Sequence, residues 1–172
     1  MKKYIKQIHI FIFSWLPVLL YFGERSYIAQ DEGYYALQAR WILEKNNWLA
    51  PMWWGEISFD RTIGTQWLIA ISQRIFGATI FSTHVPSLLC AFITLLITYE
   101  LSKRYLGEDY KWLSPIILCC TYLWVNNAHL ASQDMPLLSL EMIGIYSLTT
   151  NNKKYLNIYN FFSGFWIGLA FL

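Results

Sequence analysis

Three short stretches of this sequence carry carboxylates in settings where they could do chemistry. Asp31 and Glu32 are adjacent, Asp60 is followed directly by Arg61, and Asp134 stands in a third stretch. A carboxylate can act as a general base towards an acceptor group. An arginine, with its planar fork of N–H donors, suits the charge of a phosphate leaving group. The elements around these residues must therefore show whether the three stretches can meet.

Each acid also has a structural alternative. Asp31 and Glu32 precede a helical pattern, where an acid is often an N-cap that accepts free backbone N–H groups. The neighbouring Asp60 and Arg61 equally suit a surface salt bridge or a cap. Asp134 is harder to explain in this way, because a carboxylate close to hydrocarbon is costly unless it is solvated or paired.

The composition favours a membrane protein. Of the 172 residues, 56% are hydrophobic, 19% are aromatic and only 14% are charged, and the mean hydropathy is +0.32. These values exclude a disordered chain, a coiled coil and a disulfide scaffold. A net charge of +2 with scattered basic residues does not indicate a nucleic-acid partner, so membrane lipid is the expected surrounding.

We predict an all-α integral membrane protein in which residues 1–172 form a single transmembrane domain. A helix needs about 20 apolar residues to cross a bilayer. Five segments come close to this length, at 4–22, 85–101, 112–130, 135–149 and 155–172. The segment Ile63–Phe76 is shorter and interrupted by polar residues, so we predict that it lies on the membrane interface. Glycines in the last two spans are expected to permit close helix packing, at Gly144, Gly164 and Gly168.

The basic residues agree with five spans. They fall in short loops on one side of the membrane, at Lys2, Lys3, Lys6, Lys103, Arg104, Lys111, Lys153 and Lys154. By the positive-inside rule this side, with the N terminus, is cytoplasmic. The loop at 23–84 is then extracytoplasmic, in a multi-pass protein of the plasma or inner membrane.

The long external loop is expected to contain two amphipathic interfacial helices. The first covers Gly33–Asn46, and the second is Ile63–Phe76. Their predicted apolar stripes are Tyr34, Leu37 and Trp41, and Ile63, Trp67, Ile71 and Ile75. Four tryptophans are expected at headgroup depth, namely Trp48, Trp53, Trp54 and Trp67. All three acid stretches then lie at the outer interface, where their convergence would favour group transfer involving a phosphorylated lipid.

Other polar residues are ambiguous. Glu141 lies within a predicted span, where it is either functional or packed against a hydrogen-bonding partner. His129 is either a metal ligand beside Asp134 or a satisfied polar group. His9 and His84 receive no role.

Several runs of residues recur in the order that characterises a known family. They are Gln30–Ala36, Arg40–Glu44, Trp48–Pro51, Gly55, Phe59–Arg61, Trp67–Leu68 and Ile75–Gly77. This order resembles the first external loop of family 39 glycosyltransferases, which include lipid A aminoarabinose transferases and protein O-mannosyltransferases. The ordered match covers residues 30 to about 90 and extends more loosely to Asp134.

The resemblance implies the N-terminal part of a GT-C fold. Such enzymes transfer a sugar from a polyprenyl phosphate, at the outer face of the membrane, to a lipid, glycan or protein acceptor with inversion. The acid matching Asp31 is the base and Glu32 supports it. Asp60 would hold either a divalent metal or the acceptor, Arg61 would face the lipid phosphate, and Asp134 would have a supporting role.

Two departures qualify this expectation. Family members carry Lys-Pro where this sequence has Arg61-Thr62, so a rigid helix start is missing. The chain also ends inside an apolar segment, Gly168–Leu172, from which we expect the front part of something longer. The alternatives are an inactive truncated portion and a small non-enzymatic multi-span protein, such as an assembly partner or a transporter portion using Glu141. Ionisable residues lie mainly in loops, which favours the transferase.

Overall fold

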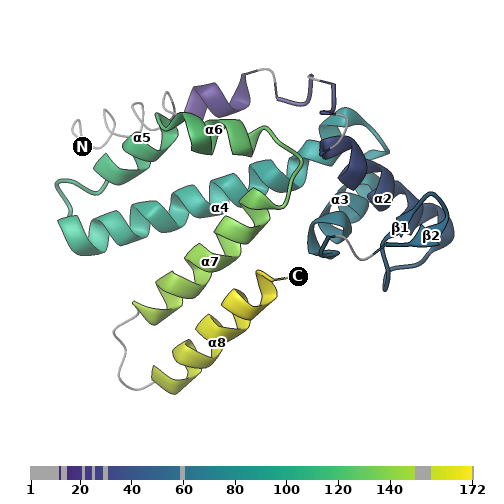
Figure 1. Cartoon of the computed structure of the whole chain (residues 1–172). Coiled ribbons are helices and arrows are strands. Elements are labelled where there is room, and N and C mark those ends of the chain that lie inside the picture. Colours follow the sequence, from purple (N-terminus) through teal and green to yellow (C-terminus); the bar gives the residue numbers. More distant parts are fainter. Residues whose placement is uncertain are drawn as a thin grey trace.

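One long helix, α4 (Ile80–Leu106), runs through the length of the structure, a computed structural model (Figure 1). The structure describes residues 12, 15–20, 22–24, 26–28, 31–58, 61–149 and 156–171. Among the helices described, α4 alone is long and apolar enough to cross a membrane. Its 27 residues correspond to about 40 Å, more than the hydrocarbon thickness of about 30 Å. The span predicted from residue 85 thus begins five residues earlier.

The start of α4 is tied to the preceding helix. Thr79 caps it in a reciprocal arrangement with Ser82, which satisfies free backbone donors. Pro86 lies inside the helix and, having no N–H, cannot bond the Ser82 carbonyl. The Ser72 hydroxyl donates to that carbonyl instead, at 2.6 Å. The carbonyl that Pro86 leaves without a backbone donor therefore connects α4 to helix α3 (Gly64–Phe76).

The span predicted at 112–130 is not one helix. It consists of α5 (Leu113–Cys119) and α6 (Tyr122–Ala128), separated at Thr121, whose backbone is extended. The Thr121 hydroxyl donates to the Ile117 carbonyl at 2.9 Å. This bond adds a second partner to a carbonyl that also accepts the Cys120 N–H at 3.1 Å, so a side chain helps to close the last turn of α5.

Helix α7 (Asp134–Leu148) packs along α4, and a further helix, α8 (Leu156–Leu169), packs against α7. Helices α7 and α8 lie side by side (Figure 1). A Cβ added at Gly144 would lie 2.6 Å from the Ile167 side chain and 3.3 Å from the Ser163 carbonyl, whereas Gly164 and Gly168 face open space among the described residues. The prediction of close packing is therefore right for Gly144 and wrong for the other two.

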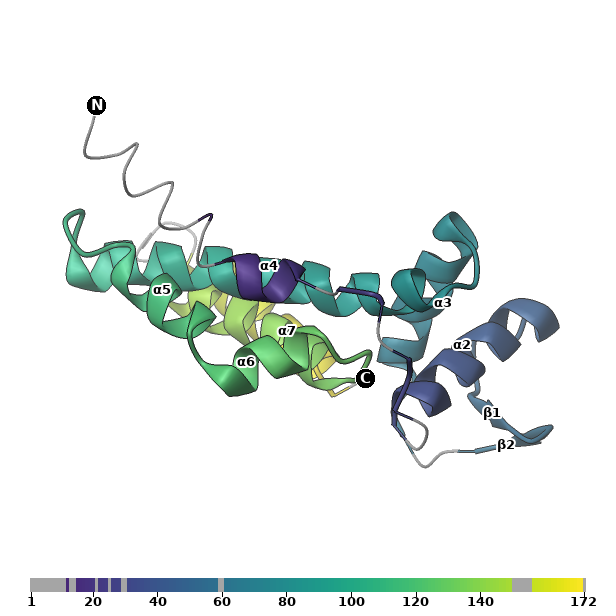
Figure 2. The ribbon, with the colours of Figure 1, turned by 90° about the horizontal axis from the view of Figure 1, so that it is seen from above.

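Helices α2 (Glu32–Lys45) and α3 lie beyond the N-terminal end of α4 (Figure 2). In the sequence between these two helices, a small hairpin pairs β1 (Met52–Trp53) with β2 (Glu56–Ile57) in antiparallel register. Trp54 and Gly55 both have positive φ, as a tight two-residue hairpin turn requires. The sequence pattern predicted both helices but not the hairpin.

Two apolar clusters hold these parts together. One lies between α4 and its neighbours and includes Val18, Leu95, Trp124 and Met135; the other joins α2 to α3 through Tyr35, Ala39, Ile42, Ile69 and Ala70. Of the stripe predicted for α2, which is Tyr34, Leu37 and Trp41, only Tyr34 is buried. Leu37 and Trp41 are only half-buried.

Helix α3 buries a mixed face, with Gln66, Ser72 and Gln73 beside Ile69 and Ala70. Ile71 and Ile75, two residues of the apolar stripe predicted to meet the membrane interface, are exposed. The polar side chains face α2 and α4, where Gln66 donates to Gln38 and Gln73 donates to Thr83. Hydrogen bonds to α2 and α4 therefore accompany the apolar packing of Ile69 and Ala70 on the buried face.

Candidate functional site

Asp31 and Arg61 form an ion pair where α2 and α3 meet. The Arg61 Nη1 donates to Asp31 Oδ1 at 2.8 Å, and the two side chains remain 33% and 42% exposed. Asp31 occupies the N-cap position of α2 but makes no capping hydrogen bond with its side chain. Its carboxylate is therefore available to a partner or substrate rather than used by the helix start.

Two tyrosine rings flank the guanidinium of Arg61. Its central carbon lies 4.9 Å from the ring centroids of both Tyr34 and Tyr35, within range of a cation–π interaction. The Asp31 carboxylate accepts from this guanidinium, which holds the pKa of Arg61 above its ordinary value. Arg61 therefore remains charged and keeps a defined orientation.

Tyr35 brings the third acid stretch to the same place. Its hydroxyl donates to Gln133 Oε1 at 3.0 Å, next to Asp134 at the start of α7. Burial raises the pKa of the Tyr35 hydroxyl, and Asp31 and Asp134 add to the rise, against the lowering effect of Arg61. Both carboxylates are therefore close enough to act electrostatically on one hydroxyl. Ser132 donates to Asp134 at 2.9 Å.

Glu32 has a different position from its neighbour. Its side chain is fully buried, and its oxygens accept the backbone N–H groups of Ile28 and Ala131 and contact His84. A group enclosed in this way holds segments together rather than meeting a substrate. The sequence did not distinguish these roles for Asp31 and Glu32.

Asp60 lies outside the described residues, so its predicted role stays a prediction. Within the described part of the chain, no group of three or more His, Cys, Asp or Glu side chains is arranged to hold a metal ion. His129 contacts the Val18 carbonyl through Nε2 at 2.7 Å, as expected of a satisfied polar group.

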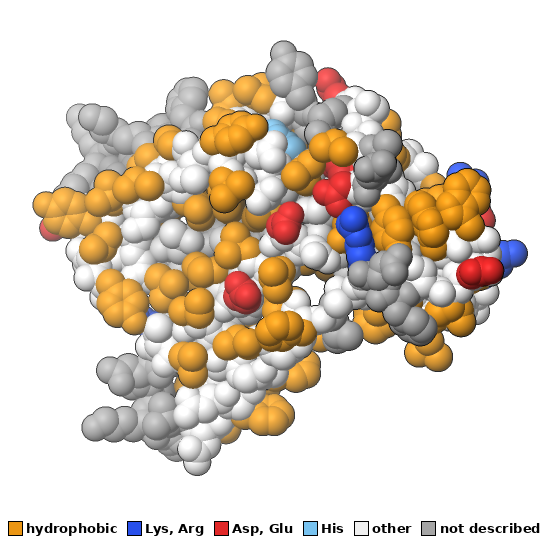
Figure 3. Space-filling model, viewed as in Figure 1, with side chains coloured by type: hydrophobic (Ala, Val, Ile, Leu, Met, Phe, Trp, Pro, Cys, Tyr) orange, Lys and Arg blue, Asp and Glu red, His pale blue; other side chains and the backbone are white. Residues whose placement is uncertain are grey.

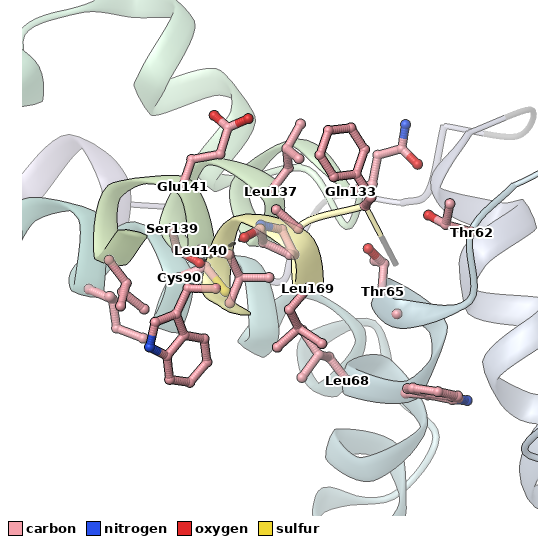
Figure 4. A pocket seen from close by; sticks show the side chains of 18 of the residues that line it. Thr62, Thr65, Leu68, Cys90, Gln133, Leu137, Ser139, Leu140, Glu141 and Leu169 are labelled. Carbon is pink, nitrogen blue, oxygen red and sulfur yellow. Dashed lines mark hydrogen bonds between the residues drawn. The ribbon is translucent and has the colours of Figure 1, made fainter. Parts of the chain in front are cut away.

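An apolar cavity of about 730 Å³ opens beside this cluster, between α3, α4, α7 and α8. Thr62 and Gln133, the chain neighbours of Arg61 and Asp134, are part of its wall (Figure 4). Glu141 lines it farther along α7 and is exposed. On the face that Figure 3 shows, charged side chains are few over α4 and α7 and more frequent near α2 and α3.

Sequence reasoning missed four residues of this arrangement. Tyr35, Gln133 and His84 received no role, and Tyr34 was placed only on an apolar stripe. The adjacent tyrosines do belong to a run that carries the family resemblance, which was the one available signal. Nothing in the local sequence indicates that Gln133 or His84 meets α2.

The fold combines one membrane-length helix with an acid–arginine cluster beside an apolar cavity. A solved structure with the same fold is ArnT from Cupriavidus metallidurans in the apo state, which aligns with 98% of this chain at a TM-score of 0.81 and 14% identity.

The chain belongs to the family described as dolichyl-phosphate-mannose-protein mannosyltransferase, whose sequence profile matches residues 60–172. An uncharacterized protein of Aquifex aeolicus is 29% identical over 92% of the chain. An undecaprenyl phosphate-alpha-4-amino-4-deoxy-L-arabinose arabinosyl transferase of Pseudomonas fluorescens is 29% identical over 54% of it. The chain is thus related to transferases that use polyprenyl-phosphate-linked sugars.

The matched segment is a minor part of these relatives. It covers 32% of the Aquifex protein, 16% of the Pseudomonas transferase and 32% of the ArnT chain. The chain therefore spans a third or less of the length of the curated relatives it matches.

Proposed function

We propose that this chain is the N-terminal part of a glycosyltransferase that takes a sugar from a polyprenyl phosphate and gives it to an acceptor at the outer face of a cell membrane. The acceptor class is a lipid, a glycan or a protein with a free hydroxyl or phosphate. Asp31 is the catalytic base, Arg61 binds the donor phosphate, and Asp134 supports the site.

The ion pair between Asp31 and Arg61 is the observation that carries this proposal. It places a partly exposed base 2.8 Å from a partly exposed cation. The adjacent cavity is apolar, which suits an isoprenoid chain whose phosphate would lie near Arg61. Charge, exposure and hydrophobicity thus match the parts of one amphipathic substrate.

The chemistry follows from this arrangement. Asp31 accepts the proton of the acceptor O–H group while the acceptor oxygen bonds to the anomeric carbon from the face opposite the phosphate. The bond between that carbon and the phosphate oxygen breaks, and its electron pair leaves with the polyprenyl phosphate. Arg61 stabilises the negative charge that develops there. Because donor phosphate competes for Arg61, donor binding frees Asp31 to act as base.

Sugar transfer by the Asp31→Asn variant tests this assignment. Membranes containing the chain, alone and together with a polypeptide carrying the remaining part of a relative, are supplied with a radiolabelled undecaprenyl-phosphate sugar. Replacing the base should lower the transfer rate by about a hundredfold to ten-thousandfold, while the amount of chain in the membrane stays the same.

Glu56→Gln is the matched control, because Glu56 is an exposed acid of the same loop in strand β2. It should transfer sugar at the wild-type rate. Wild-type transfer by Asp31→Asn would remove Asp31 from the role of base. Absence of transfer by the wild-type chain in both settings would overturn the proposed activity.

A further inference from the structure

One buried carboxylate connects three separate segments of this protein. Glu32 Oε2 accepts the Ile28 N–H at 2.9 Å, and Oε1 accepts the Ala131 N–H at 2.9 Å. The same Oε1 lies 3.0 Å from His84 Nε2. Glu32 therefore joins the turn before α2, the second turn of α4 and the connection between α6 and α7.

His84 completes the arrangement with both of its ring nitrogens. Nδ1 lies 2.7 Å from the Ile80 carbonyl, which can only accept, so Nδ1 carries a hydrogen. One further hydrogen lies between Nε2 and Glu32 Oε1, bonded either to the nitrogen or to the oxygen. In both arrangements the pair carries no net charge, which lowers the free-energy cost of burying it.

The surroundings keep water away from this pair. The Tyr27 ring stacks on the imidazole with centroids 5.8 Å apart, and the Phe22 ring meets it edge-on at 6.2 Å. His84 is 1% exposed, and Glu32 and Ala131 are fully buried. Hydrogen bonds in such surroundings are strong, and losing one partner is costly.

We propose that Glu32 and His84 act as a positioning pair that sets the relative places of Asp31 and Asp134. Asp31 directly precedes Glu32, and Asp134 begins α7 three residues after Ala131. The pair therefore connects the chain next to one site carboxylate with the chain next to the other. The consequence for catalysis rests on the proposed function, whereas the connection itself does not.

Backbone hydrogen–deuterium exchange of the chain in lipid nanodiscs, without substrate, tests the connection. In His84→Leu the amides of Ile28 and Ala131 should exchange about tenfold to a hundredfold faster, because Glu32, which accepts both N–H groups, loses its buried partner. In His84→Gln protection should stay close to that of the wild type, since the amide N–H can replace Nε2–H as donor.

Gln66→Leu is the matched control. It breaks another buried side-chain bond of α2, from Gln66 to Gln38, without touching Glu32. Ala131 should keep its protection in this variant. If His84→Leu does not fold, Glu32→Gln provides the same test, because an amide nitrogen replaces one accepting oxygen and faces a backbone donor. Wild-type exchange at both amides in these variants would overturn the proposal.

The effect on sugar transfer is measured on the same variants. A displacement of the site by about 1 Å costs about a hundredfold in rate, so kcat of His84→Leu should fall by that order while the donor KM changes by less than about threefold. His84→Gln should recover most of the rate.

The two proposals fail in different ways. Faster amide exchange in His84→Leu, with no transfer even by the wild-type chain, would overturn the proposed activity and support the connection. Faster exchange with undiminished transfer by His84→Leu would overturn the positioning role in catalysis.

Discussion

At the scale of single residues, the geometry separates two adjacent acids that look alike in the sequence. Asp31 is partly exposed and paired with Arg61, whereas Glu32 is enclosed and accepts backbone hydrogen bonds. Adjacent residues at a helix start point in different directions, so one can meet a substrate while the other faces the interior. Which of the two side chains is exposed and which is buried depends on the rotation of α2 about its axis relative to the neighbouring helices.

Replacing Arg61 tests its assignment to the donor phosphate. Arg61→Gln should raise the donor KM by about tenfold to a hundredfold, because a charge-assisted hydrogen bond is lost. Arg61→Lys keeps the charge but loses the fork and the stacking on Tyr34 and Tyr35, so it should recover only part of the affinity. Full recovery by lysine would show that charge alone matters. An unchanged KM in Arg61→Gln would exclude Arg61 from donor binding.

The protonation of Tyr35 gives a prediction about pH. Its pKa is raised from the ordinary value of 10.0, first by burial, so the hydroxyl stays neutral through the physiological range. A raised pKa means that the folded state holds this proton more tightly, and the resulting stability is lost only as pH rises through the folded-state pKa. The difference in tyrosinate absorbance between wild type and Tyr35→Phe should therefore appear above pH 10. A difference that titrates below pH 10 would contradict this arrangement.

At the scale of elements, close packing between helices depends on particular small residues rather than on glycine content. Helices α7 and α8 approach each other at Gly144, where a Cβ would meet Ile167 and Ser163, while Gly164 faces open space. Small residues at an interface let two helix backbones come close in a membrane. The two glycines therefore have different consequences when they are replaced.

Gly144→Ala and Gly164→Ala form a matched pair that tests this packing. The first should destabilise the chain by about 1–3 kcal/mol, because an added methyl group overpacks the contact. The second should be neutral or stabilising by up to about 1 kcal/mol, because alanine favours the helix more than glycine does. Thermal unfolding in detergent, followed by circular dichroism, measures both. Equal melting temperatures for the two variants would contradict the packing at Gly144.

At the scale of the whole molecule, one end carries the acid–arginine cluster and the other end carries the exposed basic residues Lys103 and Arg104 of α4. The positive-inside rule assigns the basic end to the cytoplasm. Because α4 is long enough to cross a membrane, we predict that the cluster lies on the extracytoplasmic side. A test of the membrane orientation therefore also tests on which side of the membrane the cluster lies.

Labelling with a membrane-impermeant maleimide tests this orientation. Leu49→Cys and Tyr110→Cys place thiols at positions where the native side chains are 89% and 63% exposed, on a background with Cys120 replaced by serine. In right-side-out vesicles Leu49→Cys should react, whereas Tyr110→Cys should react only after the membrane is permeabilised. The reverse pattern would invert the topology and place the cluster in the cytoplasm.

The sequence by itself determined the class of protein, most of its helices and the acids worth attention. Composition indicates a membrane protein because burial in lipid requires apolar side chains over long segments. Helices α2, α3 and α7 lie close to their predicted bounds, since periodicity and capping act over a few residues. The predicted spans are less accurate, since only α4 among the described helices is long enough to cross a membrane. The third predicted span is interrupted by the extended backbone at Thr121, which is not visible as a change in hydrophobicity.

Only the tertiary structure decided which groups meet. Arg61 reaches Asp31 across 30 positions, His84 reaches Glu32 across 52, and Ala131 reaches Glu32 across 99. Local preferences define where a helix begins and ends, but they leave free its rotation and its distance from other helices. Those are set by side-chain packing and by the need of buried polar groups for partners, and this is why α3 buries Gln66 and Gln73 together with Ile69 and Ala70.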